Sequence, residues 1–157
     1  MTHNMSSKKI ALFLATGMYI GYSPVAPGTL GSLLGVIICF FLSLGSPLLY
    51  GIALFLSFSA ALWAASIAKE HFGKKDPSQI VCDEVIGNMV ALFLIPFTSL
   101  NVIIVFLLFR FFDIVKPVPI GIIDRKIEGG FGIVFDDIAA GIYANVVFRI
   151  IMKFAAL

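Results

Sequence analysis

The stretch "LGSLLGVIICFFLSLGSPLLYGIALFLSFSAALWAASIA", residues 30–68, decides the fold, because it contains no charged residue and no histidine. It lies within a longer uncharged run, residues 10–68, and a second such run covers residues 85–109. A water-soluble helix keeps a polar face along its length, and neither run has one. A hydrophobic stretch of about 20 residues crosses a bilayer as a helix. The pattern therefore predicts helices that lie in a membrane.

Composition supports the same class. Of the 157 residues, 60% are hydrophobic and 13% are charged, and the mean hydropathy is +1.05. Soluble domains are roughly half apolar and about a quarter charged. We expect an all-α, polytopic membrane helical bundle that forms a single domain over residues 1–157. The N-terminal stretch continues into further apolar sequence without a clear cleavage site, so we expect it to be retained.

About four hydrophobic segments follow one another along the chain. Residues 30–45 are predicted to run outward and residues 46–68 to return, joined by an uncharged turn. Residues 85–112 form either one long kinked helix or a short hairpin that turns around Pro96. Residues 138–157 form the last segment. It either spans the bilayer, with Arg149 and Lys153 snorkelling or facing a partner helix, or lies partly in the interface. Before them, residues 8–22 are expected to be interfacial or re-entrant.

Most basic residues lie in three groups: Lys8 and Lys9, then residues 69–75, then residues 110–126. The positive-inside rule places all three groups on the cytoplasmic side. A single span over residues 85–112 would place the second and third groups on opposite faces of the membrane, whereas a hairpin keeps both on the cytoplasmic face. We therefore favour the hairpin. Cys39 and Cys82 have no metal-type spacing and are expected to be free thiols, with a ligand role for Cys82 as the minor alternative.

Seven of the nine carboxylates fall in residues 83–84 and 113–137. The pairs Asp83/Glu84 and Asp136/Asp137 are each expected to begin an apolar helix, where the helix dipole favours negative charge. Adjacent carboxylates also repel each other unless a cation intervenes, and carboxylate oxygens suit Mg²⁺. At this point the acidic pairs are either helix N-terminal charges or Mg²⁺ ligands. On either helix, small residues follow the acids at helical spacing, which allows close helix packing; these are Gly87 and Ala91, then Gly141 and Asn145.

Other polar motifs contain the kinds of groups that bind a phosphate. "RFFDIVKP" places Arg110, Asp113 and Lys116 three residues apart. They form either a local set of ion pairs or a site in which Arg110 and Lys116 bind a phosphate while Asp113 binds a metal ion or handles a proton. "APGTLGS" offers backbone amides together with Thr29 and Ser32. "EGGFG" at 128–132 lets the backbone approach a ligand closely.

Three stretches together resemble the phosphatidylglycerophosphatase A family of bacterial membrane lipid phosphatases. They are "SPVAPGTLGSL" at 23–33, "IVCDEVIGNMVA" at 80–91 and "FRFFDIVKPVPIGIIDRKIEGGFGIVFDDIAAG" at 109–141. The resemblance implies Mg²⁺-dependent removal of the terminal phosphate of phosphatidylglycerophosphate, which gives phosphatidylglycerol, at the cytoplasmic face of the bacterial inner membrane.

On that basis we assign the following roles. Asp83, Glu84, Asp136 and Asp137 are the expected Mg²⁺ ligands, and the expected catalytic residues are Asp113, Asp137, Lys116 and Arg110. The expected substrate-binding residues are Thr29, Ser32, Arg110, Lys116 and Arg125. Water attack and a covalent aspartyl-phosphate both remain open.

The expected partners are a phospholipid substrate and the membrane, without nucleic acid. Two rival functions use the same charged residues: a small transport or ion-pathway protein, and a non-catalytic membrane subunit.

Overall fold

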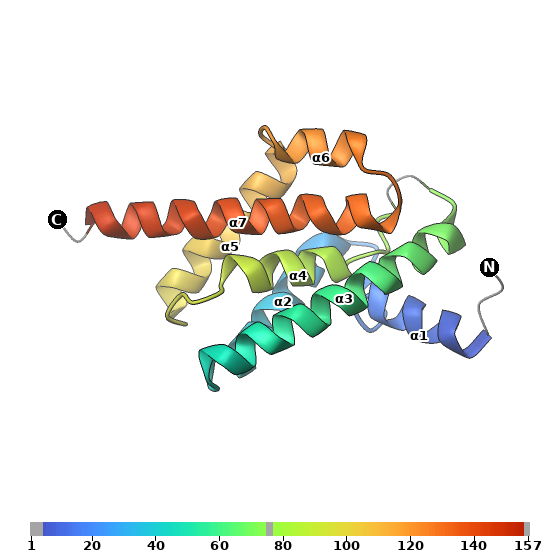
Figure 1. Cartoon of the computed structure of the whole chain (residues 1–157), viewed down its shortest axis with the longest axis horizontal. Helices are drawn as coiled ribbons and strands as arrows, with labels where there is room; N and C mark the ends of the chain where they lie inside the picture. The colour runs from blue at the N-terminus through green and yellow to red at the C-terminus, as the bar shows by residue number, and fades with distance from the viewer. Residues whose placement is uncertain (1–4, 75–76, 156–157) are drawn as a thin grey trace.

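The computed structural model describes residues 5–74 and 77–155, and within them every regular element is a helix (Figure 1). The elements are α1 (Met5–Ala15), a short 3-10 turn η1 (Ile20–Tyr22), α2 (Pro27–Ser43), α3 (Pro47–Phe72), α4 (Cys82–Ala91), α5 (Ser99–Val115), α6 (Ile120–Lys126) and α7 (Gly129–Ala155). The all-α prediction is confirmed. The N-terminal piece that was expected at 8–22 is α1 followed by η1.

The first two predicted segments correspond to α2 and α3. Each helix begins with a proline in its first turn, where the missing N–H costs no hydrogen bond. Ser46 caps α3 by accepting a hydrogen bond from the Leu49 amide. At its other end α3 continues past the predicted boundary to Phe72 and ends at Gly73, which has a left-handed backbone.

The segment at 85–112 is broken, so the alternative of one long helix is wrong. Helix α4 ends at Ala91, and α5 begins at Ser99 after a loop that contains Pro96. Thr98 caps α5 by accepting a hydrogen bond from the Asn101 amide. Asn101 in turn donates to the Pro96 carbonyl at 2.9 Å, which stabilises the loop.

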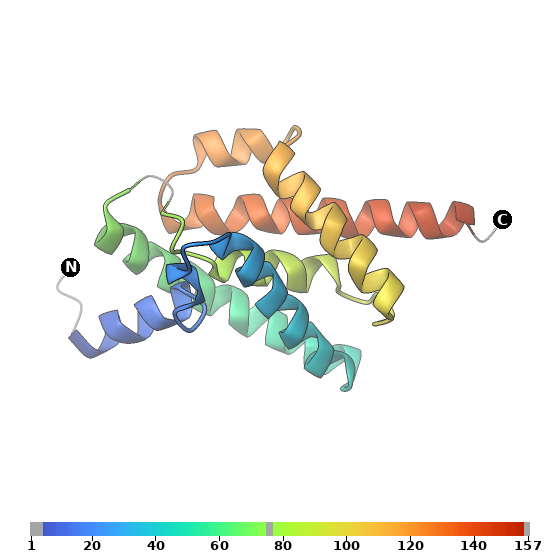
Figure 2. The ribbon, with the colours of Figure 1, turned by 180° about the vertical axis from the view of Figure 1, so that it is seen from behind.

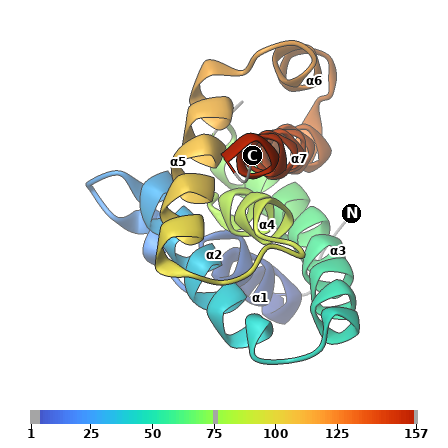
Figure 3. The ribbon, with the colours of Figure 1, turned by 90° about the vertical axis from the view of Figure 1, so that its left-hand side faces the viewer.

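Helix α4 lies at the centre of the molecule, with α7, α5, α2, α1 and α3 around it (Figure 3). Figure 2 shows α5 crossing α7 on the far side of the view in Figure 1. Small residues allow the close approach of α4 and α7, as predicted. A Cβ atom on Gly141 would lie 2.4 Å from the Gly87 carbonyl oxygen. The two backbones therefore touch where each helix carries glycine.

The start of α7 differs from the prediction. The last segment was expected to begin at residue 138, after a glycine-rich loop, but α7 begins at Gly129. Its glycines serve close packing: a Cβ on Gly130 would lie 2.3 Å from the Ser66 amide nitrogen of α3. Asp136 and Asp137 consequently lie inside α7, and the prediction that this pair begins a helix is wrong. Asp83 and Glu84 do lie in the first turn of α4.

The outer surface is strongly apolar. Large exposed side chains include Phe41 on α2, Phe55 on α3, Leu107 on α5 and Ile150 on α7. By length and composition, α3 and α7 could each cross a membrane, and α2 is a shorter apolar helix. Both cysteines are free and buried, as expected.

Candidate active site

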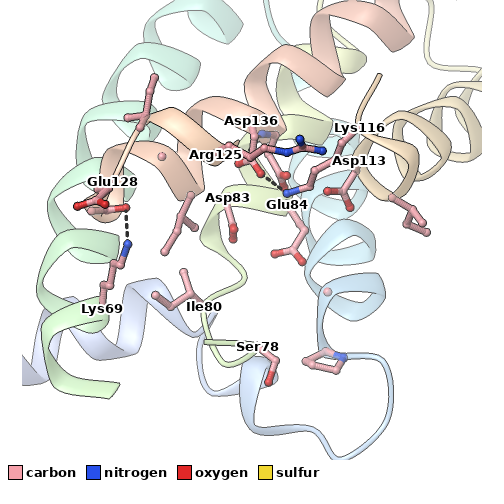
Figure 4. Close-up of a pocket in the computed structure, with 18 residues that line it drawn as sticks. Lys69, Ser78, Ile80, Asp83, Glu84, Asp113, Lys116, Arg125, Glu128 and Asp136 are labelled. Carbon is pink, nitrogen blue, oxygen red and sulfur yellow. Dashed lines mark hydrogen bonds and ion pairs between the residues drawn. The ribbon is translucent and has the colours of Figure 1, made fainter. Parts of the chain in front are cut away.

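Four helix segments meet at one end of α4. They are the first turns of α2 and α4, the last turns of α5 and the third turn of α7. The polar residues that the sequence singled out lie on these segments. A cavity of about 740 Å³ is lined by six of them, Asp83, Glu84, Asp113, Lys116, Asp136 and Asp137, and it also has walls from α3 and α6 (Figure 4). Thr29, Ser32 and Arg110 do not line this cavity.

Three carboxylates form a compact group in this cavity. Asp83, Glu84 and Asp137 each offer an oxygen, and these oxygens lie within 4.8 Å of one another. Asp83 is 9% exposed and Asp137 is 4% exposed. Each of the three has a buried oxygen without a hydrogen-bond partner. Buried carboxylate oxygens without partners are costly, so the group has the chemistry of a hard-cation site.

The electrostatics of α4 agree with this geometry. Burial raises the pKa of Asp83 well above its ordinary value, and the Glu84 and Asp137 carboxylates raise it further. Burial also raises the pKa of Glu84 to about 7, although the Arg110 guanidinium opposes the shift. A cation among these oxygens would remove the repulsion between them.

Asp136 was predicted as a fourth ligand but does not belong to this group. Its carboxylate pairs with Lys116, with Oδ2 lying 2.5 Å from Nζ. Its other oxygen accepts a hydrogen bond from the Asp137 amide. Successive residues in a helix point about 100° apart, so the two aspartates face different neighbours.

The end of α5 brings Lys116 to this position. Lys116 closes α5 with a left-handed backbone, φ 46°, immediately before Pro117. A left-handed backbone is uncommon for residues other than glycine, and such strain is found at functional sites. The conformation ends the helix and lets the ammonium group meet Asp136.

Arg110 joins α5 to α2. Its Nη1 donates to the Asp113 carboxylate at 2.8 Å and to the Ser32 hydroxyl at 3.3 Å. Ser32 is fully buried and donates its own proton to the Gly28 carbonyl. Ser32 therefore holds the guanidinium in place, whereas it was predicted to bind substrate directly.

The two remaining predicted substrate residues differ in position, because Arg125 lines the cavity and Thr29 does not. Thr29 is half-buried in the first turn of α2, next to Gly28. Arg125 is exposed on α6 and lines the cavity beside Lys116 and Asp136 (Figure 4).

Gly28 and Lys69 line this cavity, although sequence reasoning did not assign either of them to the site. A Cβ on Gly28 would lie 2.2 Å from Glu84 Oε1, so glycine leaves the space that this carboxylate occupies. The position of Gly28 between Pro27 and Thr29 in "APGTLGS" was the available signal. Lys69 lines the wall formed by α3. It had been counted only as part of a basic loop.

Known proteins are similar to this chain over nearly its whole length. The family model described as Phosphatidylglycerophosphatase A matches residues 13–152. A Haemophilus influenzae protein named phosphatidylglycerophosphatase A is 41% identical over 94% of each chain. A Bacteroides thetaiotaomicron protein named putative phosphatidylinositol-3-phosphatase is 38% identical over 90% of this chain and 92% of that one. An Escherichia coli protein named phosphatidylglycerophosphatase A is 34% identical over 82% of this chain and 76% of that one. No solved structure matches.

Proposed function

The chain belongs to the phosphatidylglycerophosphatase A family, and on that premise we propose a mechanism in which Asp83, Glu84 and Asp137 hold Mg²⁺. Its activity is the hydrolysis of phosphatidylglycerophosphate to phosphatidylglycerol and phosphate. The chain is thus a lipid phosphatase, in contrast to the transport protein or non-catalytic subunit considered above.

One observation carries the metal assignment: the three carboxylates converge while Asp83 Oδ1, Glu84 Oε2 and Asp137 Oδ2 have no hydrogen-bond partner. Oxygen ligands of this kind suit Mg²⁺, which is commonly shared between protein carboxylates and a substrate phosphate. When bound, the ion would neutralise phosphate oxygens and lower the pKa of a water molecule. Asp136 is not part of the proposed ligand set, because its carboxylate is engaged with Lys116.

Basic side chains would bind the terminal phosphate. Arg110 is held by Asp113 and Ser32, so its remaining N–H groups are oriented before the substrate arrives. Lys116 and Arg125 supply two more positive charges on the same side of the cavity (Figure 4). Thr29 and the first amides of α2 complete the proposed phosphate contacts.

Asp113 is the proposed base. It lines the cavity one helical turn after Arg110, and its charge contributes to the raised pKa of Glu84, so it lies near the metal group. Its carboxylate would accept a proton from the attacking water while Arg110 fixes its orientation.

The chain is a membrane-associated lipid enzyme, and we propose that it is multi-pass in the bacterial inner membrane. In this arrangement α2, α3, α5 and α7 provide the four hydrophobic segments. Helix α4, with 10 residues, is too short to span and enters from the cytoplasmic side. The exposed apolar surface and the three basic groups support this placement. The cavity would then open to the cytoplasm at the depth of the lipid headgroups.

The similarity to the Bacteroides protein favours a second candidate substrate, phosphatidylinositol 3-phosphate. Both lipids carry a phosphomonoester on a headgroup that a phosphodiester joins to diacylglycerol. The cavity is within the range that holds ligands larger than phosphate, about 300–1,000 Å³.

The test is phosphate release by purified protein in detergent, with each lipid in turn and with or without Mg²⁺. We expect Mg²⁺-dependent release from phosphatidylglycerophosphate. Faster release from phosphatidylinositol 3-phosphate would favour the second candidate. Equal release after the metal has been removed with EDTA would contradict the metal site.

A further inference from the structure

The cavity extends well beyond the three carboxylates. Its opposite wall comes from other parts of the chain: the last turn of α3, residues 78–80 before α4, and residues 127–129 before and at the start of α7. In the view of Figure 4, Lys69 lies on this wall, and Asp83 and Glu84 lie between it and Lys116. Lys69 and Lys116 thus lie on two sides of the proposed metal site, and Glu128 lies on the same wall as Lys69 (Figure 4).

Lys69 has an unusual environment. Its ammonium group donates to the Gly129 carbonyl at 3.3 Å. Among the side chains that the structure describes, no carboxylate lies within ion-pair distance of it. It lies in the last turn of α3 and beside the first residue of α7, so the two helix dipoles act on its charge in opposite directions. An anion that enters the cavity beside this half-buried ammonium group would stabilise its charge.

We propose that Lys69 binds the inner phosphodiester phosphate of the lipid headgroup while the terminal phosphomonoester lies at the Asp83, Glu84 and Asp137 group. This inference rests on the proposed function. It assigns a second anion subsite to the same cavity and gives the two phosphates of the substrate separate binding groups.

The depth of Lys69 supports this assignment. Helix α3 has 26 residues and is about 39 Å long at 1.5 Å per residue, whereas the hydrocarbon core of a bilayer is about 30 Å thick. Its last turn therefore reaches the headgroup region. A phospholipid with a headgroup alcohol carries its phosphodiester in that region, and a lysine at a helix end extends its ammonium group there.

The subsite would select the class of lipid. A substrate in which a phosphodiester separates diacylglycerol from the reacting phosphate can contact Lys69 and the metal group together. Binding at two points also orients the terminal phosphate before reaction. The product keeps the inner phosphodiester, so phosphatidylglycerol should bind to Lys69 alone, and inorganic phosphate should bind to the other subsite alone.

The test uses these two ligands as competitive inhibitors. Release of radiolabelled phosphate from phosphatidylglycerophosphate in mixed micelles gives an inhibition constant for phosphatidylglycerol and another for inorganic phosphate. Lys69→Gln removes the charge but keeps an N–H donor for the Gly129 carbonyl. We expect the variant to bind phosphatidylglycerol about tenfold more weakly, in line with the loss of one charged hydrogen bond, and inorganic phosphate as before.

Lys74→Gln is the matched control, because Lys74 is exposed on the loop after α3 and does not line the cavity. It should leave both inhibition constants unchanged, and Lys69→Arg should restore most of the affinity for phosphatidylglycerol. Equal weakening of both inhibitors, no change in either, or no inhibition of the unaltered protein by phosphatidylglycerol would overturn the proposal. An unaltered protein that releases no phosphate from phosphatidylglycerophosphate would instead contradict the proposed function itself.

Discussion

Asp136 and Asp137 are adjacent in the chain, but their carboxylates belong to different groups. Asp136 pairs with Lys116, whereas Asp137 joins Asp83 and Glu84. One turn of α7 thus supplies both the partner of Lys116, which we propose to bind phosphate, and a proposed metal ligand. The repulsion expected between two neighbouring aspartates is reduced because the helix directs them to different sides.

Asp136→Asn should separate these two functions. The variant keeps the three proposed ligands but loses the ion pair that holds Lys116. We expect its affinity for Mg²⁺, measured by calorimetry, to stay near that of the unaltered protein, while KM for the lipid rises about tenfold because Lys116 loses its ion pair with Asp136. A large loss of Mg²⁺ affinity would mean that Asp136 is a ligand after all.

Gly28→Ala should disable the site without unfolding the protein. The added methyl group would lie 2.2 Å from Glu84 Oε1, so the carboxylate must move away from Asp83 and Asp137. We expect phosphate release to fall by about 100-fold or more. Gly51→Ala is the control, since its methyl group would meet nothing closer than 4.0 Å. Normal activity in Gly28→Ala would show that the position of Glu84 is unimportant.

Gly141→Ala should weaken the contact between α4 and α7. Its methyl group would lie 2.4 Å from the Gly87 carbonyl oxygen, and a backbone atom cannot rotate away as a side chain can. Overpacking of this kind costs about 1–3 kcal/mol. The melting temperature in detergent should fall, whereas that of Gly51→Ala should not. An unchanged melting temperature would indicate that the helices are not held this closely.

The break between α4 and α5 is stabilised by α7, which yields another prediction. Asn145 donates to the carbonyls of Ala91 and Phe93 at 2.8 and 2.9 Å, and Arg149 donates to those of Phe93 and Leu94 at 3.1 Å. Asn145→Leu removes the donor to the Ala91 carbonyl, at a cost of about 1–3 kcal/mol, while the Phe93 carbonyl keeps its hydrogen bond from Arg149. We expect a lower melting temperature with Mg²⁺ affinity retained. Loss of metal binding with unchanged stability would contradict this role.

These observations show which features the sequence could predict. Long uncharged runs and a proline at 96 are local signals, and they predicted α2, α3 and the break before α5. Arg149 was left with two interpretations, snorkelling or facing a partner helix, and in the structure it instead donates to the Phe93 and Leu94 carbonyls in the loop after α4. The family resemblance also followed from contiguous motifs.

Features that depend on packing between distant segments could not be predicted. The glycines at 129–132 looked like a loop because sequence does not show that Gly130 packs against Ser66 of α3. With the start of α7 misplaced, the different directions of Asp136 and Asp137 could not be foreseen. Gly28 and Lys69 approach the site only when α2 and α3 pack against α4 and α7.

The proposed membrane arrangement predicts which positions of the chain are accessible from each side of the membrane. In a background without Cys39 and Cys82, single cysteines at Lys74 and Lys126 should react with a membrane-impermeant reagent only when the cytoplasmic side is exposed. A cysteine at Ser46, in the turn between α2 and α3, should react from the opposite side. Labelling of positions 74 and 126 from different sides would rule out the hairpin formed by α4 and α5.

The most direct test of the metal site is the Mg²⁺ dependence of phosphate release from phosphatidylglycerophosphate by the unaltered protein and by Asp137→Asn. The substitution keeps the size of the side chain but removes the negative charge of one proposed ligand. We expect release by the variant to be at least about 100-fold slower at every Mg²⁺ concentration, while its melting temperature without Mg²⁺ is not reduced, because one uncompensated buried charge is gone. Near-normal, Mg²⁺-dependent release by Asp137→Asn would contradict the assignment.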